Sequence, residues 1–440
     1  MPFLLADAPR RRAGGPWRAG GGGPSRRGLE GSVRAPGRRR RGGEERASES
    51  MMEGEEKGAA FMRMALSLAA RGKGMAHPNP MVGAVVVKGG KVIGKGYHRG
   101  PHSPHAEVLA LAQAGGDAGG GDLYVTLEPC NHHGRTPPCT EAILRAGIRR
   151  VVIAAPDPNP NVAGGGAERL RSQGVLVEVG VLREESEDMN AAYRKYVATG
   201  MPLVTVKVAA TADGKAAARG GRSRWITGEA ARRLAHAMRR ESDAVLVGRG
   251  TVDADDPELT VRMVPLRGAR PPLRVVVDSR LSLSLKSRLA QGGEPRVIVA
   301  TTEGHDAGKA EALRERGVEV LALPGDEAGR VDLRELLAAL GRREVAHLLV
   351  EGGPTLVSAL FRLGLVDRLS LFVAGKVFGD SEARSWVEGA VVEDPSQALR
   401  LKWRRSRRLG DDLLLEADVA CGWEDPGEKA HSAKVKDGGR

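Results

Sequence analysis

Short runs rich in β-branched residues alternate with helical runs along most of this 440-residue chain. Residues 83–87 (GAVVV) and 123–127 (LYVTL) are typical of buried strands, whereas residues 105–115 (HAEVLALAQAG) have helical spacing and end at a glycine. Strands that alternate with helices pack in layers, because each helix must cover the apolar face of a sheet. The sequence therefore predicts an α/β fold.

The same alternation gives a map of the predicted elements. Residues 81–98 contain two β-rich runs joined by Gly-Gly, which predicts a hairpin. The other predicted strands are 122–130, 149–158, 175–181, 202–211, 243–251, 273–279, 296–302, 346–353, 367–377 and 411–419. The predicted helices are 59–72, 105–115, 140–148, 166–174, 227–241, 331–343 and 355–365.

The length and a composition break predict two folded domains. A chain of 440 residues is longer than one core supports, and the α/β rhythm restarts after residues 196–202 (YVATGMP). We predict a disordered Arg/Gly-rich extension over 1–54, a first domain over 55–200, a second over 201–420, and a polar tail over 421–440.

The net charge of +13 is concentrated at the start of the chain. Residues 1–50 hold 12 arginines, 5 acidic residues and 11 glycines, a composition that cannot bury enough apolar surface to fold. This segment is predicted to have no catalytic use, with the functional start at Met51 or Met52. A transit peptide and an RNA-binding arm are the two alternatives.

The small number of cysteines and the hydropathy of the chain indicate the cellular compartment of the protein. Three cysteines do not make a disulfide framework, and no apolar run reaches the 18 residues that span a bilayer. We expect a cytoplasmic protein with no membrane partner. Cys421 lies in the polar tail and is predicted to be incidental.

Residues 127–139 (LEPCNHHGRTPPC) bring together the other two cysteines, Cys130 and Cys139. Cys130 follows a predicted strand and Cys139 precedes a predicted helix, whose N-terminal dipole favours a thiolate. A structural zinc site completed by His132 and His133 is one interpretation, and a thiol redox pair is another.

A second segment favours a catalytic zinc site over a structural one. His105-Ala-Glu107 opens the predicted helix 105–115, and His-x-Glu followed by Pro-Cys…Cys is typical of zinc deaminases. In that chemistry one histidine and two thiolates hold Zn²⁺, the metal lowers the pKa of a water molecule, and the glutamate transfers protons to the ring and the leaving amine. We therefore predict a catalytic zinc site.

The spacing between the cysteines is unusual, because eight residues separate them where deaminases commonly have two. The polar and basic insert NHHGRTPP must form a loop over the site, suited to an anionic substrate. Residues 77–85 (HPNPMVGAV) begin with a stiff Pro-Asn-Pro loop, in which Asn79 is either a contact to a pyrimidine edge or a turn residue.

The second domain carries weaker motifs. It has no G-x-G-x-x-G after its first strand, but VEGGPTLVSAL (residues 350–360) places two glycines before a helix, which suits a phosphate. GTVDADDPELTVR (residues 250–262) is predicted to be a charged loop. GRSRWITGEAARR (residues 221–233) places Trp225 before a helix that Thr227 is predicted to cap. These motifs indicate a phosphate-binding α/β domain.

The stretches HPNPMVGAVVV, GYHRGPHSPHAEV, YVTLEPCNHHGRTPPC and DPNPNVAGGG resemble the deaminase half of the bifunctional riboflavin-biosynthesis deaminase–reductase family, over about residues 55–200. The resemblance implies a cytidine-deaminase-like three-layer α/β/α domain. It also implies that His105, Cys130 and Cys139 bind Zn²⁺ and that Glu107 shuttles the proton. His132 and His133 are then not ligands.

The three motifs of the second domain, together with VKVAATADGK, resemble the reductase half of the same family. This resemblance implies a dihydrofolate-reductase-like α/β fold that uses NADPH. The implied NADP contacts are Ala209, Trp225, Thr251, Asp255, Ser279, Gly353, Pro354, Thr355, Leu356, Val357, Ser358 and Ala359. The implied substrate contacts are Ser223, Arg239, Leu259, Arg262 and Glu351, with Lys207 and Asp255 as candidates for steering the hydride step.

The expected function is therefore zinc-dependent deamination of a phosphoribosylamino-diaminopyrimidinone, followed by NADPH-dependent reduction of its ribosyl group to ribityl. The family forms dimers or larger oligomers, so a homo-oligomer is expected, with no nucleic-acid partner. A base deaminase acting on tRNA shares the His-Ala-Glu and Pro-Cys elements, but it needs no reductase domain. A regulatory protein with an inactive second domain is the third alternative; intact Arg239, Arg262, Asp255 and Glu351 argue against it.

Overall fold

The computed structural model describes residues 56–132, 137–160, 165–389 and 393–420. All of these described residues belong to one compact unit. The predicted disordered extension and the predicted polar tail lie outside the described residues, as do residues 133–136 in the middle of the predicted zinc-site loop. No helix in the described part of the chain is long and apolar enough to span a membrane.

A five-stranded sheet with the order β2-β1-β3-β4-β5 forms the first layered body. Its strands are β1 (Gly83–Lys88), β2 (Lys91–Tyr97), β3 (Asp122–Leu127), β4 (Arg150–Ala155) and β5 (Leu176–Val179). β1 pairs antiparallel with β2 and β3, whereas β3, β4 and β5 run parallel. Gly89 and Gly90 have positive φ angles and close the predicted hairpin.

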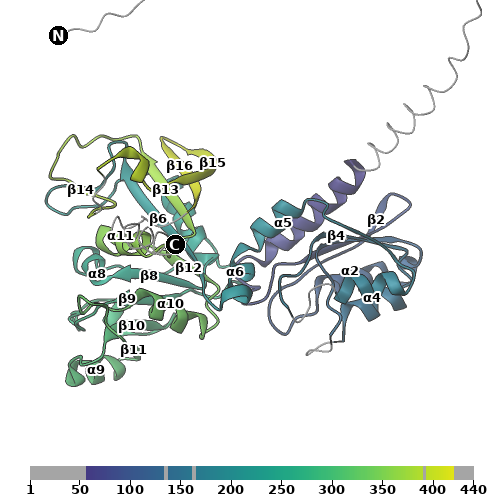
Figure 1. The fold of residues 1–440 in the computed structure, drawn as a ribbon, viewed down its shortest axis with the longest axis horizontal. Coiled ribbons are helices and arrows are strands. Elements are labelled where there is room, and N and C mark those ends of the chain that lie inside the picture. Colours follow the sequence, from purple (N-terminus) through teal and green to yellow (C-terminus); the bar gives the residue numbers. More distant parts are fainter. Residues whose placement is uncertain (1–55, 133–136, 161–164, 390–392, 421–440) are drawn as a thin grey trace, which may run out of the picture. The chain divides into compact units, whose positions relative to one another are not determined.

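Helices cover both faces of this sheet (Figure 1). One face carries α2 (Ala106–Ala114), α3 (Cys139–Arg145) and α4 (Gly165–Ser172), whose apolar residues pack on Ala84, Val125 and Ile153. The other face carries the helix over residues 56–69 and α5 (Arg183–Met189), which pack on Val85 and Val152. This arrangement confirms the expected three-layer α/β/α architecture.

A nine-stranded sheet with the order β11-β10-β9-β8-β12-β6-β13-β16-β15 forms the second body. The strands from β11 to β13 in this order run parallel, and β16 and β15 add an antiparallel edge. Their bounds are β6 (Leu203–Thr211), β8 (Ala244–Gly248), β9 (Leu273–Val277), β10 (Val297–Thr302), β11 (Val318–Leu323), β12 (His347–Val350), β13 (Arg368–Ala374), β15 (Leu401–Leu409) and β16 (Asp412–Val419). A small ribbon pairs β7 (Lys215–Ala217) with β14 (Arg384–Ser385).

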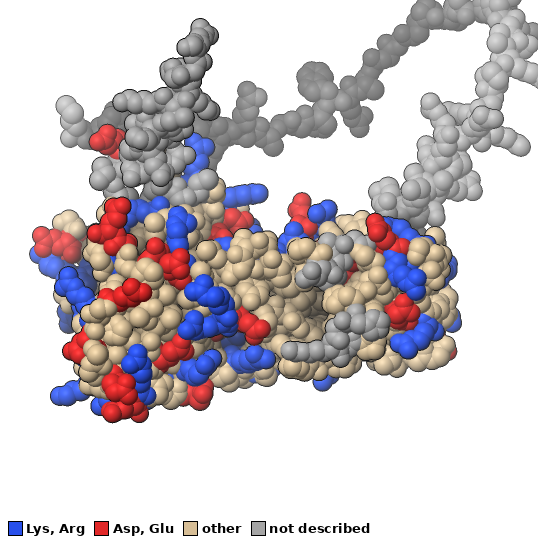
Figure 2. Space-filling view, turned by 60° about the horizontal axis from the view of Figure 1, so that its bottom comes forward, with Lys and Arg blue, Asp and Glu red and all other residues tan. Residues whose placement is uncertain are grey.

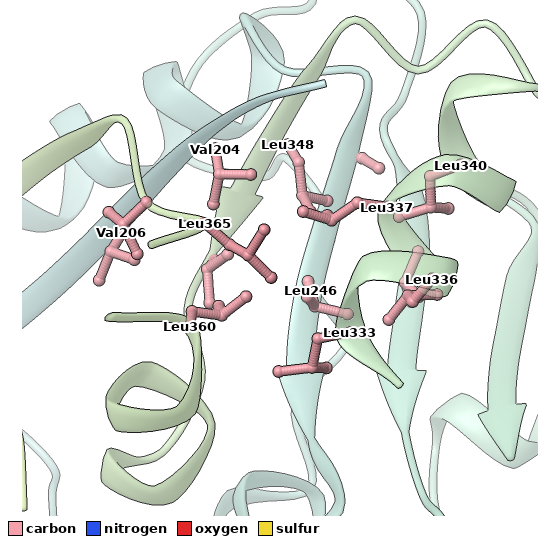
Figure 3. Packing of buried hydrophobic residues seen from close by; sticks show 14 of the residues in the cluster. Val204, Val206, Leu246, Leu333, Leu336, Leu337, Leu340, Leu348, Leu360 and Leu365 are labelled. Atoms are coloured by element: carbon pink, nitrogen blue, oxygen red, sulfur yellow. The ribbon is translucent and has the colours of Figure 1, made fainter. Parts of the chain in front are cut away.

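The second sheet is also covered on both faces. On one face Leu336, Leu337 and Leu340 of α10 and Leu360 of α11 pack against strand residues such as Leu348 (Figure 3). On the other face, Val252 and Leu313 lie in a separate apolar cluster. The helices are α6 (Ala191–Thr199), α7 (Glu229–Arg240), α8 (Arg249–Asp255), α9 (Ala307–Arg314), α10 (Leu333–Gly341) and α11 (Pro354–Arg362), with short 3₁₀ turns η3 (Leu289–Gln291) and η4 (Pro395–Gln397). The first body contains the 3₁₀ turns η1 (Ala70–Gly72) and η2 (Gly115–Ala118).

Two local predictions in the second body are wrong. The segment predicted as a charged loop after β8 begins with helix α8, because Gly248 and Arg249 continue directly into helical turns. Helix α7 is capped by Gly228 and not by Thr227. The Gly228 N–H donates to the Asp412 carboxylate at 2.7 Å, so a carboxylate from another segment replaces the predicted hydroxyl cap.

Candidate active sites

The three predicted metal ligands come from the ends of three elements. Cys130 follows β3, and Cys139 is the first residue of α3 after the N-cap Pro138. His105 is the N-cap of α2, with an extended backbone (φ −69°, ψ 159°), so it precedes the helix and is not part of its first turn. All three residues therefore lie at the loop edge of the five-stranded sheet.

Their donor atoms converge on one point. His105 Nδ1 lies 3.1 Å from Cys139 Sγ and 3.6 Å from Cys130 Sγ. All three donor atoms lie within 4.8 Å of one another, the only such group of metal-binding side chains among the described residues. One imidazole nitrogen and two sulfurs are the donor set of a catalytic zinc site, which leaves a fourth position for water or substrate. The residues present therefore fit zinc.

Hydrogen bonds within the site shift the pKa values of the two cysteine thiols. Cys130 Sγ accepts a hydrogen bond from Cys139, and His105 and the Cys139 backbone N–H add to it; together these hold the pKa of Cys130 at about 4. The same shared hydrogen bond and burial raise the pKa of Cys139. A lowered thiol pKa favours the thiolate, which is the form that binds a metal ion.

Glu107 lies in the first turn of α2, two residues after the histidine ligand, and its side chain is buried. Burial raises its pKa, against the opposing influence of His105. A buried carboxyl group next to the metal ligands can accept a proton in one step and donate it in a later one. The position and the environment of Glu107 therefore suit the predicted proton shuttle.

The first turn of α4 packs against the segment that carries Cys130. A Cβ atom at Gly166 would lie 1.9 Å from the Pro129 carbonyl oxygen, so only glycine permits this approach. Glu128 Oε1 accepts a hydrogen bond from the Ala167 N–H at 3.0 Å. Thr140 Oγ1 donates to Asn131 Oδ1 at 2.9 Å. These contacts fix Cys130 between its neighbours.

A cavity of about 550 Å³ opens over the metal ligands. It is lined by Pro78, Asn79, His98, Pro101, His102, Ser103, His105, Cys130, His132, Arg270 and Glu344. Asn79 Nδ2 lies 3.1 Å from His98 Nε2, and the His98 and His105 rings meet edge to face at 5.5 Å. Asn79 is therefore part of the cavity wall as well as a turn residue. His132 lines the cavity without joining the metal cluster.

This geometry predicts that zinc binding requires the two cysteines but not the loop histidines. Cys139→Ser should lower the bound zinc well below one ion per chain, because the site loses one of three protein ligands. His132→Ala should leave the zinc content unchanged. Zinc content is measured by atomic absorption on the purified variants. Loss of zinc from His132→Ala would instead support the structural-clip alternative.

The second site gathers three charged side chains in the nine-stranded sheet. Arg239 on α7 donates two hydrogen bonds to Glu351, at 2.6 and 3.0 Å, and Lys207 Nζ on β6 lies 3.0 Å from the same carboxylate. The two cations hold the pKa of Glu351 far below its usual range, although burial alone would raise it. Arg239 also donates to the Thr260 carbonyl at 3.0 Å, which brings the loop containing Leu259 to the cluster.

The start of α11 follows Glu351 closely in the sequence. Gly353 caps α11 and Pro354 is its first residue, which leaves backbone N–H groups at the helix start. A Cβ atom at Gly352 would lie 2.9 Å from a Leu356 methyl group, and one at Gly353 would lie 3.4 Å from Thr251 Oγ1. Thr251 on α8 and the α11 start therefore face each other, and the residues present fit the phosphates of NADPH.

The remaining predicted contacts are spread around these groups. Ser223 Oγ donates to Asp255 Oδ1 at 2.9 Å, so these two residues lie together. The Trp225 ring is largely exposed and stacks against Arg232. Ser279 Oγ accepts the Val331 N–H at 3.0 Å, and this hydroxyl thus serves a backbone contact. Ala209 lies on β6 and partly covers an apolar cluster.

Arg262 occupies a different environment from Arg239. Its guanidinium is half exposed and pairs with Glu258 four residues earlier, while its backbone N–H donates to His236 Nδ1 at 3.1 Å. Burial, with Arg239 and Arg262 nearby, lowers the pKa of His236 to about 4, so this ring is neutral and can accept that bond at neutral pH. Arg262 is thus held by its backbone with its charge at the surface.

The residues that sequence reasoning missed at these sites include His98, Thr260 and His236. A signal existed for His98, because three histidines occur within the eight residues from 98 to 105. Thr260 contributes a backbone carbonyl, which residue type cannot reveal. His236 lies inside an amphipathic helix, where a histidine is most simply explained by packing.

The surface shows no single basic field in the view of Figure 2. On that face of the described chain, Lys and Arg side chains are interspersed with Asp and Glu. Ion pairs such as Arg404–Asp418 and Arg219–Asp380 belong to this mixed surface. This face therefore presents charges of both signs.

Each of the two sites lies in a region of the chain that matches a known protein family. Residues 55–155 match the family described as the cytidine and deoxycytidylate deaminase zinc-binding region. Residues 202–415 match the family described as the RibD C-terminal domain. The two matches fall on the two layered bodies and confirm the expected fold classes.

Relatives match the chain over most of its length. The riboflavin biosynthesis protein RibD of Aquifex aeolicus is 45% identical over 355 residues, covering 81% of this chain and 96% of the relative. The RibD protein of Escherichia coli is 41% identical over 366 residues, covering 81% and 97%. The structure of Acinetobacter baumannii RibD, form 1, has a TM-score of 0.75 at 38% identity, covering 83% and 99%.

A deaminase/reductase structure from Thermotoga maritima gives a similar result. It has a TM-score of 0.73 at 37% identity and covers 83% of this chain and 99% of its own. Its name gives its two activities as diaminohydroxyphosphoribosylaminopyrimidine deaminase and 5-amino-6-(5-phosphoribosylamino)uracil reductase. This chain therefore belongs to the RibD family of riboflavin-biosynthesis proteins, and it joins a zinc-binding deaminase domain to an NADPH-dependent reductase domain.

Proposed function

We propose that the chain deaminates 2,5-diamino-6-(5-phosphoribosylamino)pyrimidin-4-one and then reduces the ribosyl group of 5-amino-6-(5-phosphoribosylamino)uracil to ribityl. The observation that carries the first reaction is the convergence of His105, Cys130 and Cys139 beside buried Glu107. The substrates are those in the name of the Thermotoga relative.

In the deamination, water replaces the amine on a ring carbon and ammonia leaves. Zinc, when bound, supplies a Lewis acid that lowers the pKa of that water. Glu107 takes one proton from the attacking water and delivers it to the ring nitrogen. It then transfers the remaining hydroxyl proton to the amine, which leaves as ammonia while the ring carbon becomes a carbonyl. Asn79 offers its amide to the pyrimidine edge. Its contact with His98 orients that amide in the cavity.

In the reduction, the cluster around Glu351 holds the substrate against the cofactor. NADPH, when bound, supplies the hydride that opens the ribose at its anomeric carbon. Arg262, whose guanidinium is half exposed, is the proposed grip for the ribose phosphate, because a guanidinium binds phosphate through two parallel hydrogen bonds. Arg239, which donates to Glu351 and to the Thr260 carbonyl, is proposed to hold these groups against the substrate. Lys207, with its ammonium 3.0 Å from Glu351, is proposed to protonate the ribose ring oxygen as the ring opens. The Gly353–Ala359 run and Thr251 are proposed to bind the phosphates of NADPH.

The domain organisation and the assembly state complete the proposal. We place the catalytic domains at 55–200 and 201–420, which agrees with the separate sheets at Gly83–Val179 and Leu203–Val419. We also propose a homo-oligomer in the cytoplasm. The compartment is supported by Cys130 and Cys139, which are free thiols and bind zinc only when reduced.

Removing the metal tests whether zinc is needed for the deamination alone. Treating the purified protein with a strong zinc chelator should abolish ammonia release from the diaminopyrimidine substrate, and added zinc should restore it. NADPH oxidation with the already deaminated substrate should continue, because the Glu351 cluster contains no metal ligand set. Loss of both activities, or of neither, would contradict the assignment of zinc to the first reaction alone.

A further inference from the structure

The loop between the helix over 56–69 and β1 is held by residues of the reductase half. The Gly74 carbonyl accepts the Arg270 N–H at 3.2 Å, and Lys73 pairs with Glu241 at 3.2 Å. A Cβ atom at Gly74 would lie 2.2 Å from the Arg240 carbonyl oxygen, so the two backbones touch there. The loop is therefore packed closely against the end of α7 and the segment that follows it.

The central contact in this junction joins His77 to Asp243. His77 Nδ1 lies 2.8 Å from Asp243 Oδ2, and the His77 side chain is only 8% exposed. The same carboxylate oxygen accepts the backbone N–H groups of Ala346 and His347, at 3.0 and 2.9 Å, at the start of β12. Asp243 is thus fixed by the central sheet of the reductase half, and it in turn fixes His77.

The residues that directly follow His77 in the sequence line the deaminase cavity. Pro78 and Asn79, the next two residues, both line that cavity. Asn79 contacts His98 at 3.1 Å, and the His98 ring packs on the ring of the zinc ligand His105. A chain of contacts therefore runs from the reductase sheet through His77 to the wall of the zinc site.

Two residues of the reductase half also line the cavity themselves, Arg270 and Glu344. Arg270 is exposed, and its backbone is held in place by Gly74. It is the only lysine or arginine among the described residues that line this cavity. Glu344 repels an anion, so Arg270 is the group of this half that attracts one.

We propose that the reductase half completes the substrate pocket of the deaminase. Asp243 is a positioning residue that holds the His77–Asn79 loop, and Arg270 binds the phosphate of the deaminase substrate. This inference rests on the proposed function, because it assigns Arg270 to the phosphoribosyl group of that substrate. Guanidinium and phosphate form charge-assisted bidentate hydrogen bonds, which give both affinity and orientation.

Arg270→Ala tests the direct contact without threatening the fold, because the side chain is exposed. The KM for ammonia release should rise about tenfold or more, which corresponds to one charge-assisted hydrogen-bond pair, with kcat and zinc content unchanged. Ribose 5-phosphate, added as a competitive inhibitor of ammonia release, should bind more weakly by a similar factor. Arg267→Ala, an exposed arginine three residues earlier that does not line the cavity, is the matched control and should have no effect.

Asp243→Asn tests the positioning role, because it keeps the side-chain shape and removes the charge. It should raise the KM of the deaminase several-fold with kcat and zinc content retained, while the kinetic constants of the reductase stay the same. Lys73→Ala, which removes the exposed ion pair of the same junction, is the control and should leave both activities unchanged. Unchanged deaminase KM in both Arg270→Ala and Asp243→Asn would overturn the inference. Absence of ammonia release from the unmodified chain would instead overturn the proposed function.

Discussion

Glu107→Gln should lower ammonia release by a factor of about 10² to 10⁴, the usual contribution of a positioned general acid–base group. Glutamine matches the volume of the buried side chain but cannot carry a proton between water, ring and amine. Zinc should remain bound, because His105, Cys130 and Cys139 are untouched. Ammonia release and zinc content are measured on the same preparation.

Glu168→Gln is the matched control, since it makes the same substitution at an exposed position on α4. It should leave both quantities at the level of the unmodified chain. The proton-shuttle role fails if Glu107→Gln keeps its zinc and still releases ammonia at the original rate. Loss of zinc from this variant would show that the carboxylate supports the metal site.

Glu351→Gln should remove reductase activity and destabilise the reductase half by about 3–5 kcal/mol, the cost of breaking a buried ion pair by removing one partner. Arg239 and Lys207 then remain buried without a compensating carboxylate, since their side chains are only 14% and 16% exposed. The free energy of unfolding is measured by urea titration, and activity by NADPH oxidation with the deaminated substrate.

The difference in the free energy of unfolding between the unmodified chain and Glu351→Gln should depend on pH in a definite direction. The pKa of Glu351 is depressed in the folded chain, so its stabilising contribution is present above the pKa of an unfolded glutamate and is lost as the pH falls toward the folded value. The stability gap between the unmodified chain and Glu351→Gln should therefore narrow on acidification. Glu327→Gln, in an exposed loop of the same half, is the control. A gap that is absent at neutral pH would refute the role of this ion cluster.

The α/β architecture could be predicted because its signals are local. The Gly-Gly hairpin of β1 and β2 and the buried runs of β3, β4 and β8 are short and rich in valine, a length and composition that are typical of buried strands. Strand β15 was missed, because LKWRRSRRL is almost wholly exposed and its extended form comes from pairing with β16. Helices α5 and α6 were missed because charged and small residues hide their apolar stripe.

The zinc site was predictable for a related reason. Its ligands lie on two short motifs, and each motif sits where a strand or a helix ends, so residue type and spacing already define the geometry. The ion cluster was not predictable from spacing, because Arg239 and Glu351 are 112 residues apart in the sequence. Only the order of strands in the nine-stranded sheet brings them together. The family resemblance named them, but not their mutual contact.

The most direct test of the central claim is a coupled assay on the purified chain. The diaminopyrimidine phosphoribosyl compound is supplied with NADPH, and ammonia release and NADPH oxidation are followed in the same sample. Both reactions should occur, with ammonia appearing first and NADPH oxidation approaching the same amount. Ammonia release without NADPH oxidation, or NADPH oxidation that does not depend on prior deamination, would contradict the account of two consecutive reactions in one chain.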